Sequence, residues 1–526
     1  MVLLLGFLVV LITVLPYLYG YFSRPANTVY TGIHNLTPGD TNAVLSLMEQ
    51  VKQGNFIFKN LYTAEPQDRI YTNPFWLSAG LIAKVFKLPN LFTLHFIRSV
   101  LIIVFVVVLY LFLRYFIEKK RLRIWSFVVI LFSSGLGLFF NPFFINSEDI
   151  LNHPTDIWVP ESITFLTLYN LPHQIASLIL IILVFLFMFL AFENNRYKYS
   201  LMAGIFSFLL LWFHPFNGPT IYGVLGVYLL AIFFYKKKII WSYIKHYIIL
   251  CLIPLPVLLY FFLINQADWV IKNWAKQNIL LSPSLWMYLI GYGFLVPLAV
   301  YGLYKLSQKK DKKNIFIISW FITSSLLLYS PLSFQRRLSE GLHIPLTILA
   351  MAGVFYLTKK WHSKEKGYNL KAYAIFIFLL IFLPLTNIQI VSQDIYIYKT
   401  DPEFPYYLGQ EEVLAMQWIK KNSSDQSIIF SSYLIGNFIP AYSGRRVWIG
   451  HGPQTINLEK KKEINKWFWQ EDNLAKEKYK LLKKDNIDYL WYGQREKEMG
   501  TFNPKTKDYL KKIYNNGKVD IYQVIN

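Results

Sequence analysis

The stretch FTLHFIRSVLIIVFVVVLYLFLRYF (92–116) is followed almost at once by the basic run EKKRLR (118–123). A helix needs about 20 predominantly apolar residues to cross the hydrocarbon core of a bilayer, so the first stretch predicts a transmembrane helix. The fold class expected is therefore an α-helical polytopic membrane protein. Similar runs predict about eleven spans, near 2–22, 92–116, 124–140, 172–192, 199–213, 219–235, 243–264, 285–305, 314–330, 342–358 and 371–390.

The composition agrees with this fold class, because 54% of the residues are hydrophobic and only 16% are charged. The formal net charge of +22 could suggest nucleic-acid binding. Many of the lysines and arginines lie in short loops between apolar runs, however, where positive charge fixes membrane orientation. No nucleic-acid-binding module is recognisable, so we expect no nucleic-acid partner. The first run, 2–22, lacks a basic flank and a clear cleavage site, and we interpret it as a retained span.

The loops predict the orientation of the chain in the membrane. Positively charged short loops face the cytoplasm, so the N-terminus is expected inside and everything after Val391 outside. We expect an integral plasma-membrane protein whose long first loop, 23–91, faces outward. The short basic loops that carry this prediction are 118–123, 193–198, 235–238, 307–313 and 359–371.

The C-terminal part alternates short β-rich runs with helical patterns, which predicts a small α/β domain. The expected strands lie in 427–433, 445–450, 488–493 and 519–524, and the expected helices in 411–422 and 463–485. The first loop adds two helices, an amphipathic one at 41–54 and an aromatic, interfacial one at 73–86. We therefore predict a transmembrane catalytic domain, 1–390, that includes loop 23–91, and an extracytoplasmic domain, 391–526.

Carboxylates and arginines gather on the predicted outer face, whereas the inner face carries mainly lysine. Asp40 follows the first span and is a candidate functional acid, although it could equally cap a helix that begins at Thr41. Arg336 and Arg337 run against the positive-inside trend. They could lie among lipid headgroups, or they could clamp a phosphate or pyrophosphate of a substrate, which is the interpretation we favour. His214 lies at an outer span end, where a structural role is the commoner one.

The segment YTAEPQDRIYTNPFWLSAGLIAKVF (62–86), with Asp40 before it, resembles the first outward loop of the GT-C superfamily of polytopic glycosyltransferases. The layout is most similar to the protein O-mannosyltransferase and aminoarabinose-transferase branch. The blocks QRRLSEGLHIPL (335–346) and GNFIPAYSGRRVWIGH (436–451) are similar to segments of bacterial members.

This resemblance implies a sugar donor on a polyprenyl phosphate or pyrophosphate, and a lipid, glycan or protein acceptor. It implies an acid in the first outward loop that acts as the general base of an inverting transfer, and Asp40 matches that position. Some members carry paired acids in this loop, whereas Asp40 is flanked by Gly39 and Thr41. This departure leaves the acceptor and a divalent metal open, and the histidines show no spacing that would indicate a metal, so we predict no cofactor.

The site residues expected from this reasoning form three groups. The catalytic carboxylates would be Asp40, with Glu65 and Glu161 as possible second acids. The donor phosphate would be bound by Arg336, Arg337 and His343. The acceptor or sugar pocket would include His34, Asp68, Arg69 and His214.

Two other functions remain open. A polyprenyl-lipid transporter or flippase would also use outward arginines, but it predicts ionisable residues at mid-membrane and repeat symmetry, and the sequence shows neither. A non-catalytic carbohydrate-binding membrane protein would use the mixed aromatic and charged segments of the C-terminal part. Those segments suit the core and rim of an ordinary small domain equally well.

Overall fold

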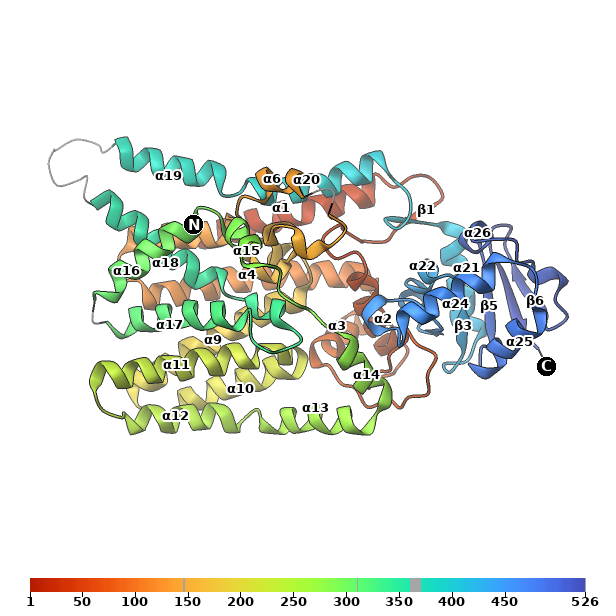
Figure 1. The fold of residues 1–526 in the computed structure, drawn as a ribbon, viewed down its shortest axis with the longest axis horizontal. Helices are drawn as coiled ribbons and strands as arrows, with labels where there is room; N and C mark the ends of the chain where they lie inside the picture. Colours follow the sequence, from red (N-terminus) through yellow and green to blue (C-terminus); the bar gives the residue numbers. More distant parts are fainter. Residues whose placement is uncertain (145–146, 310, 360–369, 526) are drawn as a thin grey trace. The chain divides into compact units, whose positions relative to one another are not determined.

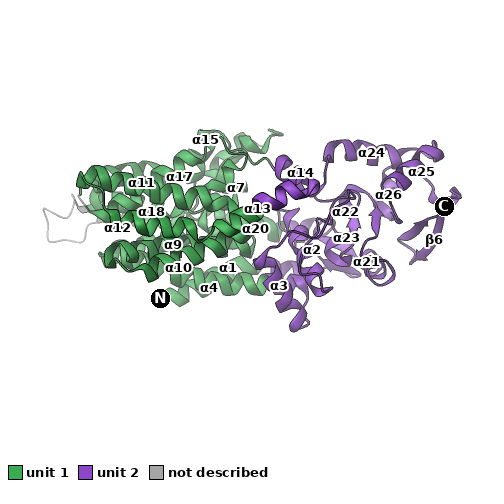
Figure 2. Ribbon diagram, turned by 90° about the horizontal axis from the view of Figure 1, so that it is seen from below, with its two compact units in different colours: residues 1–16, 95–260, 279–396 green, residues 17–94, 261–278, 397–526 purple. Residues whose placement is uncertain are grey.

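The structure is a computed structural model that describes residues 1–144, 147–309, 311–359 and 370–525. The chain divides into two compact units, which Figure 2 shows in different colours. Unit 1 comprises residues 1–16, 95–260 and 279–396, and unit 2 comprises residues 17–94, 261–278 and 397–526. The predicted first outward loop and the C-terminal segment therefore fold together in unit 2. The predicted domain boundary at residue 390 stays a prediction.

Unit 1 is helical throughout its described residues, and its longer helices run side by side as a bundle (Figure 1). Four of its helices, α1, α4, α13 and α20, continue along the chain into unit 2. The α-helices are α1 (Val2–Phe22), α4 (Asn90–Phe116), α5 (Lys120–Phe132), α6 (Gly137–Phe140), α7 (Thr155–Trp158), α8 (Thr164–Tyr169), α9 (Pro172–Asn194), α10 (Tyr197–Phe213), α11 (Gly218–Lys236), α12 (Trp241–Leu252), α13 (Leu255–Ala267), α15 (Leu285–Tyr292), α16 (Leu295–Ser307), α17 (Lys312–Leu327), α18 (His343–Lys359), α19 (Leu370–Phe382) and α20 (Leu385–Thr400). The 3-10 helices are η1 (Asn141–Phe143), η2 (Ile150–Asn152), η3 (Pro160–Ser162), η4 (Pro215–Asn217) and η5 (Gln335–Ser339).

The described helices confirm a multi-pass membrane protein. Six of them are long and apolar enough to cross a bilayer, and two bent pairs bring this number to as many as eight. The remaining three predicted spans coincide with α10, α17 and α18, which have 16 or 17 residues each. These helices are shorter than the typical length of about 20 residues. The exact number of eleven spans stays a prediction.

The basic connections between these helices lie at one end of unit 1. Lys313, at the start of α17, donates to the carbonyl of Tyr115 at the end of α4 over 2.8 Å. Lys312 donates to the hydroxyl of Tyr243 in α12 over 2.9 Å, and Phe192 near the end of α9 stacks on the same ring. These contacts place four of the predicted cytoplasmic loops together, namely 118–123, 193–198, 235–238 and 307–313. Most of the fifth, 359–371, lies outside the described residues.

Among the interrupted spans, three have breaks that satisfy one another's backbone groups. The α5–α6 pair bends by 40° and the α15–α16 pair by 88°, and α19 and α20 are interrupted at Leu383. Ser134 donates to the Leu383 carbonyl through both its amide (2.7 Å) and its hydroxyl (2.6 Å). The amide of Leu136 donates to Ile290. Irregular backbone is tolerated within a membrane protein only where protein or water pairs its polar groups, and here neighbouring breaks do so.

Asp156 in α7 completes this arrangement. Its Oδ2 atom accepts hydrogen bonds from the amides of both Gly135 and Gly137, each over 3.0 Å, and its side chain is fully buried. Burial raises the pKa of this carboxyl to about 7, although the two amide donors act in the opposite direction. The protonated carboxyl is therefore the form that folding favours.

We expect Asp156→Asn to gain thermal stability relative to the wild type as the pH rises, by several degrees between pH 4 and pH 8. A carboxyl whose pKa is raised on folding contributes stability below its unfolded pKa, and this contribution is lost as the pH rises through about 7. The amide keeps an oxygen for both glycine N–H groups but never ionises. Thermal unfolding of the detergent-solubilised protein at the two pH values measures the difference. A difference between the variant and the wild type that is the same at both pH values would contradict this account.

Unit 2 combines strands and helices from distant parts of the chain. Its strands are β1 (Thr28–Tyr30), β2 (Tyr407–Gly409), β3 (Ile428–Phe430), β4 (Arg446–Val447), β5 (Tyr489–Tyr492), β6 (Leu510–Asn515) and β7 (Asp520–Val524). Its helices are α2 (Asp40–Lys52), α3 (Pro74–Val85), α14 (Trp269–Gln277), α21 (Gln410–Asn422), α22 (Tyr433–Gly436), α23 (Ile439–Ser443), α24 (Leu458–Gln470), α25 (Ala475–Lys484) and α26 (Gln494–Glu498), with 3-10 helices η6 (Gly452–Gln454) and η7 (Pro504–Thr506).

Five of the strands form one mixed sheet in the order β4-β3-β5-β7-β6. Strand β3 pairs in parallel with both β4 and β5, whereas β7 is antiparallel to β5 and β6. Side chains alternate between the two faces, as the period of a strand requires. One face, which includes Ile429 and Trp491, packs with residues of α21 and α23. The other face, which includes Phe430 and Leu490, packs with residues of α24 and α25. The predicted small α/β domain is thus confirmed.

The predicted elements of unit 2 need two corrections. The expected helix over 463–485 is two helices, α24 and α25, because the chain turns at Leu474, where φ is 52°. Strands β1, β2 and β6 were not predicted. The helices at 41–54 and 73–86 in the first loop are present as α2 and α3, and Asn73 caps α3 by accepting a hydrogen bond from the amide of Trp76.

The first outward loop packs into the core of the C-terminal α/β part. Ala43 of α2 and Tyr62 lie in the cluster on one face of the sheet, and Ala64 lies in the cluster on the other. The amide of Val447 in edge strand β4 donates to the carbonyl of Leu61 over 2.8 Å. Both core clusters of unit 2 are therefore built from segments far apart in the chain. The hydrogen bond between Thr63 and Lys461 joins residues 398 positions apart.

Candidate active site

Helix α2 begins at Asp40, and Gly39 precedes it as the capping residue. The alternative that Asp40 caps a helix starting at Thr41 is therefore wrong, because Asp40 already has helical backbone geometry. Its carboxylate lies in the first turn of α2, where the unpaired amides and the helix dipole favour negative charge. This position places a negative charge at the positive end of the helix dipole without requiring the Asp40 side chain for a cap.

Side chains of the C-terminal part hold α2 along its length. Asn42 donates to the side-chain oxygen of Asn437 over 2.7 Å, close to the start of the helix. Glu49, near the end of the helix, forms an ion pair with Lys420 over 2.6 Å. Because Asn42 and Glu49 are both buried, α2 is anchored at both ends, and Asp40 is attached to a positioned helix.

The imidazole of His451 contacts the carboxylate of Asp40. Its Nε2 atom is 3.3 Å from Oδ1 of Asp40, and its side chain is 7% exposed, whereas that of Asp40 is 52% exposed. A Cβ atom at Gly39 would lie 3.4 Å from the imidazole, which is ordinary van der Waals contact, so the ring packs directly against the start of α2. Since a carboxylate oxygen only accepts, Nε2 carries the proton of this bond. The pair thus fixes one carboxylate oxygen while the carboxylate as a whole stays open to solvent.

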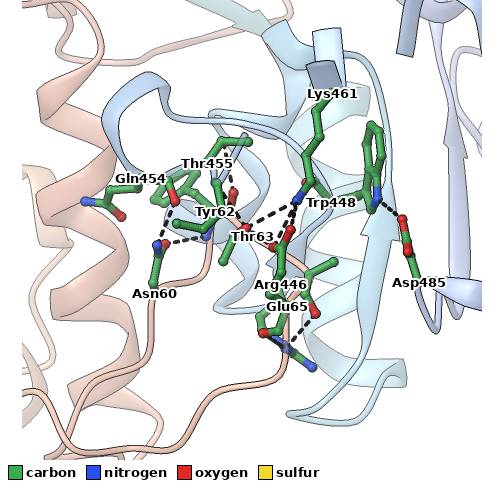
Figure 3. A network of polar contacts seen from close by, with 12 residues as sticks. Asn60, Tyr62, Thr63, Glu65, Arg446, Trp448, Gln454, Thr455, Lys461 and Asp485 are labelled. Carbon is green, nitrogen blue, oxygen red and sulfur yellow. Dashed lines mark hydrogen bonds and ion pairs between the residues drawn. The ribbon is translucent and has the colours of Figure 1, made fainter. Parts of the chain in front are cut away.

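Glu65 belongs to a second polar network in unit 2, which Figure 3 shows. Its carboxylate forms an ion pair with the ammonium group of Lys461 over 2.9 Å and accepts a hydrogen bond from the Thr63 hydroxyl. Lys461 also donates to the Trp448 carbonyl over 3.1 Å. Burial lowers the pKa of Lys461, and the Glu65 carboxylate opposes this shift. Glu65 therefore has a structural partner, and the geometry favours a role in joining the first loop to the sheet.

The same network includes further contacts between the loop and the sheet. Arg446 of β4 donates to the carbonyl of Ala64 over 3.3 Å, and Thr455 donates to that of Tyr62 over 2.9 Å. Asn60 donates to the carbonyl of Gln454 over 2.7 Å. These bonds hold the extended segment that follows α2 against the edge of the sheet (Figure 3).

The other candidates in the first loop have separate surroundings. His34 is buried, with its ring edge-on to Tyr17 and Nε2 3.5 Å from the Thr37 hydroxyl. Arg69 donates to the Gln50 side chain over 3.0 Å, and burial lowers the pKa of its guanidinium group. Asp68 is exposed.

In unit 1 the two arginines lie in η5, each over an aromatic ring. The guanidinium carbon of Arg336 is 4.7 Å from the ring centre of Trp158, and that of Arg337 is 4.2 Å from the ring centre of Phe216. Stacking on an aromatic face leaves the edge of a guanidinium group available for hydrogen bonds to an anion. Among the described residues, no carboxylate oxygen lies within 4 Å of the Arg336 side-chain nitrogens.

Glu161 and His343 lie near this pair but differ from each other in their bonding. Glu161 in η3 is 7% exposed, and its Oε2 atom is buried without a hydrogen-bond partner among the described residues. Both Glu161 and Arg336 act electrostatically on the Tyr288 hydroxyl. His343, in contrast, has Nε2 3.1 Å from the Ser133 hydroxyl and Nδ1 2.9 Å from that of Thr164. Because both ring nitrogens are engaged, the surroundings of His343 favour a structural role over phosphate binding.

His214 belongs to a buried cluster beside η4 that includes Glu340, a residue not selected from the sequence. Oε2 of Glu340 lies 3.2 Å from Nδ1 of His214 and accepts a hydrogen bond from Asn217 over 2.7 Å. Glu340 is fully buried, and its Oε1 atom has no hydrogen-bond partner among the described residues. Unit 1 thus brings Glu161, His214, Arg336 and Arg337 together around η3, η4 and η5.

His451 and Glu340 are the partners that reasoning from the sequence missed. Both lie in segments with a recognisable signal, since His451 ends the block 436–451 and Glu340 lies within 335–346. The resemblance of these two blocks to GT-C members selected the segments. It did not indicate which side chains would contact Asp40 or His214. In the part of the chain that the structure describes, no group of three or more His, Cys, Asp or Glu side chains is arranged to hold a metal ion.

No protein-family model matches the chain, and no curated protein sequence is similar to it. Its fold, however, is similar to that of solved membrane glycosyltransferases. The oligosaccharyltransferase of Archaeoglobus fulgidus in the apo form aligns with a TM-score of 0.56 at 12% identity, over 93% of this chain and 69% of that one. ArnT from Cupriavidus metallidurans in the apo state aligns with a TM-score of 0.52 at 10% identity, over 98% of this chain and 97% of that one.

Two liganded structures of the same proteins also match. The archaeal enzyme AglB in complex with an inhibitory peptide and a dolichol-phosphate has a TM-score of 0.53 at 13% identity, over 92% of this chain and 69% of that one. ArnT bound to undecaprenyl phosphate has a TM-score of 0.50 at 10% identity, over 98% and 97% of the two chains. Both proteins are GT-C superfamily membrane glycosyltransferases, and this chain has the GT-C fold.

If Glu65 is structural, Glu65→Gln should destabilise the protein by roughly 2 kcal/mol. This is less than the cost of breaking a fully buried pair, because the Glu65 side chain is 23% exposed. The loss arises because Lys461 stays buried without its counter-charge, and thermal unfolding measures it. The double variant Glu65→Gln/Lys461→Met, which removes both charges, should recover most of the loss. Equal destabilisation in both variants would contradict the ion-pair explanation.

Proposed function

We propose that this protein is an inverting glycosyltransferase that moves a sugar from a polyprenyl phosphate or pyrophosphate to an acceptor on the extracytoplasmic face of the membrane. The observation that carries the proposal is the Asp40–His451 pair, a half-exposed carboxylate with one oxygen fixed on an anchored helix. The GT-C fold over nearly the whole chain supports it, as do the lipid phosphates named in two of the similar structures. The acceptor would be a lipid, a glycan or a protein.

In the proposed reaction Asp40 removes the proton from the acceptor hydroxyl. The acceptor oxygen attacks the anomeric carbon of the sugar at the same time. The bond between that carbon and the phosphate oxygen breaks, and the polyprenyl phosphate leaves as a stable anion that needs no strong acid. His451 would act as a positioning residue, because its imidazole holds Oδ1 of Asp40 at a fixed place. Helix α2 would supply the rigidity that makes this position reproducible.

Arg336 and Arg337 would bind the donor phosphate and stabilise the charge that builds up on it. Their stacking on Trp158 and Phe216 supports this role, because it orients the planar guanidinium groups before the ligand arrives. Glu161 remains the proposed second carboxylate, and His214, His34, Asp68 and Arg69 remain proposed contributors to the acceptor or sugar pocket.

We expect Asp40→Asn to lower the rate of sugar transfer by roughly 100-fold or more, since loss of a general base costs about 10²–10⁴ in rate. The measurement is the release of polyprenyl phosphate by purified, full-length protein supplied with a panel of synthetic polyprenyl-phosphate hexoses and pentoses. The variant should still bind the donor lipid. Glu459→Gln is the matched control, because it removes a carboxylate from the same unit that is 79% exposed.

Full transfer by Asp40→Asn would remove this carboxylate from the mechanism. Donor binding without transfer by the wild-type protein, over the whole panel and with lipid, glycan and peptide acceptors, would instead favour the transporter or carbohydrate-binding functions.

Arg336→Ala should raise the KM for the donor by about tenfold, the effect of losing one charge-assisted hydrogen bond of about 1.5 kcal/mol. Arg336→Lys should recover only part of the affinity, because an ammonium group cannot form two parallel bonds with a phosphate. Steady-state kinetics at several donor concentrations separate KM from kcat. An unchanged KM in both variants would show that Arg336 lies among lipid headgroups and takes no part in donor binding.

A further inference from the structure

A cavity of about 880 Å³ lies at the end of unit 1 that carries the basic connections. It is formed where α4 passes into α5 and α16 into α17, and α18 and α19 complete its wall. These elements meet at the left end of the bundle in Figure 1. The sequence predicts that this end faces the cytoplasm. The cavity is therefore distinct from the arginine pair in η5, which lies beyond the opposite end of α17, a helix about 24 Å long.

The rim of the cavity carries a net positive charge. Its basic residues are Lys119, Arg121, Lys309 and Lys313, and its acidic residues are Glu118 and Asp311. The Asp311 carboxylate caps α17 by accepting hydrogen bonds from the amides of Lys313 and Asn314. No salt bridge between these basic and acidic side chains is present in the described residues. Lys119, Arg121 and Lys309 are therefore available to an anion at the mouth of the cavity, whereas Lys313 donates to the Tyr115 carbonyl.

The interior of the cavity is apolar and aromatic. Trp125 stacks on Phe376 at 4.5 Å, and Phe355 lies edge-on to the same ring at 5.7 Å. Ile317 of α17 and Ala352 of α18, both buried, complete the wall. A soluble phosphate would gain nothing from this lining. An amphiphile with an anionic head and an alkyl chain would use both parts, because its head would meet the rim and its chain the wall.

We propose that this cavity binds the phosphate headgroup and the first part of an acyl chain of an anionic phospholipid. Basic pockets between membrane helices on the cytoplasmic side are suited to such headgroups, because positive charge at the surface attracts them and apolar walls retain the chain. The site is independent of the proposed sugar transfer, since it uses none of the residues assigned to it. Bound lipid would connect α4, α5, α16 and α17 where their loops meet.

The test is a native mass-spectrometry titration of the full-length protein in detergent with short-chain phosphatidylglycerol. Two comparison probes are used. Short-chain phosphatidylcholine supplies the acyl chains without a net charge, and glycerol 1-phosphate supplies the charged head without acyl chains. We expect phosphatidylglycerol to bind most tightly. Arg121→Gln/Lys309→Gln should weaken this binding by roughly tenfold, and Ala352→Phe should weaken it by filling the cavity.

The matched control is Lys236→Gln/Lys238→Gln, which removes two exposed charges from the same end of unit 1 but away from the cavity. It should leave phosphatidylglycerol binding unchanged. An equal loss in this control would show diffuse surface attraction and overturn the proposal. Equal binding of phosphatidylcholine, or glycerol 1-phosphate binding as tightly as phosphatidylglycerol, would also overturn it, because the first indicates an unspecific apolar site and the second a soluble-phosphate site.

Discussion

The anchoring of α2 to the C-terminal α/β part is the constraint on which the rest of unit 2 depends. A carboxylate at the start of an isolated 13-residue helix would have no fixed position, because so short a helix is marginal in water. Here Asn437 and Lys420 hold the helix at its two ends, and His451 holds the Asp40 carboxylate itself. The C-terminal segment is thus a structural requirement of the first loop, and the proposed chemistry at Asp40 requires both.

Unit 1 follows a different constraint, which is the pairing of backbone groups where helices break. The breaks near Ser134, Ile290 and Leu383 exchange hydrogen bonds with one another, and Asp156 pairs the two remaining glycine amides. Unpaired backbone groups in an apolar environment cost several kcal/mol each, so the polar groups freed at these breaks need partners of this kind. The breaks leave short loops such as η3 and η5 at the end of the bundle opposite the basic connections, where the arginine pair lies.

Much of the fold could be predicted because it depends on composition and periodicity. Apolar runs located the spans, and alternating patterns located β3, β4, β5 and β7. The break between α24 and α25 escaped prediction because it depends on one residue, Leu474, with a positive φ. At the candidate site, residue type and position identified Asp40 and Arg336. His451 could not be paired with Asp40 because 411 residues separate them, and no local pattern encodes so distant a contact. Glu65 shows the converse, since its ion pair with Lys461 favours a structural role for an acid that its residue type and position made a catalytic candidate.

The most direct test of the central claim is hydrogen–deuterium exchange of the full-length protein, followed by mass spectrometry of its peptides. If the first loop and the C-terminal part share one core, amides of α2 should exchange as slowly as those of β3 and β5 and should become exposed together with them when unit 2 unfolds. Fast exchange throughout α2 while the strands stay protected would contradict the account, because Asp40 would then lie on a mobile loop that the sheet does not position.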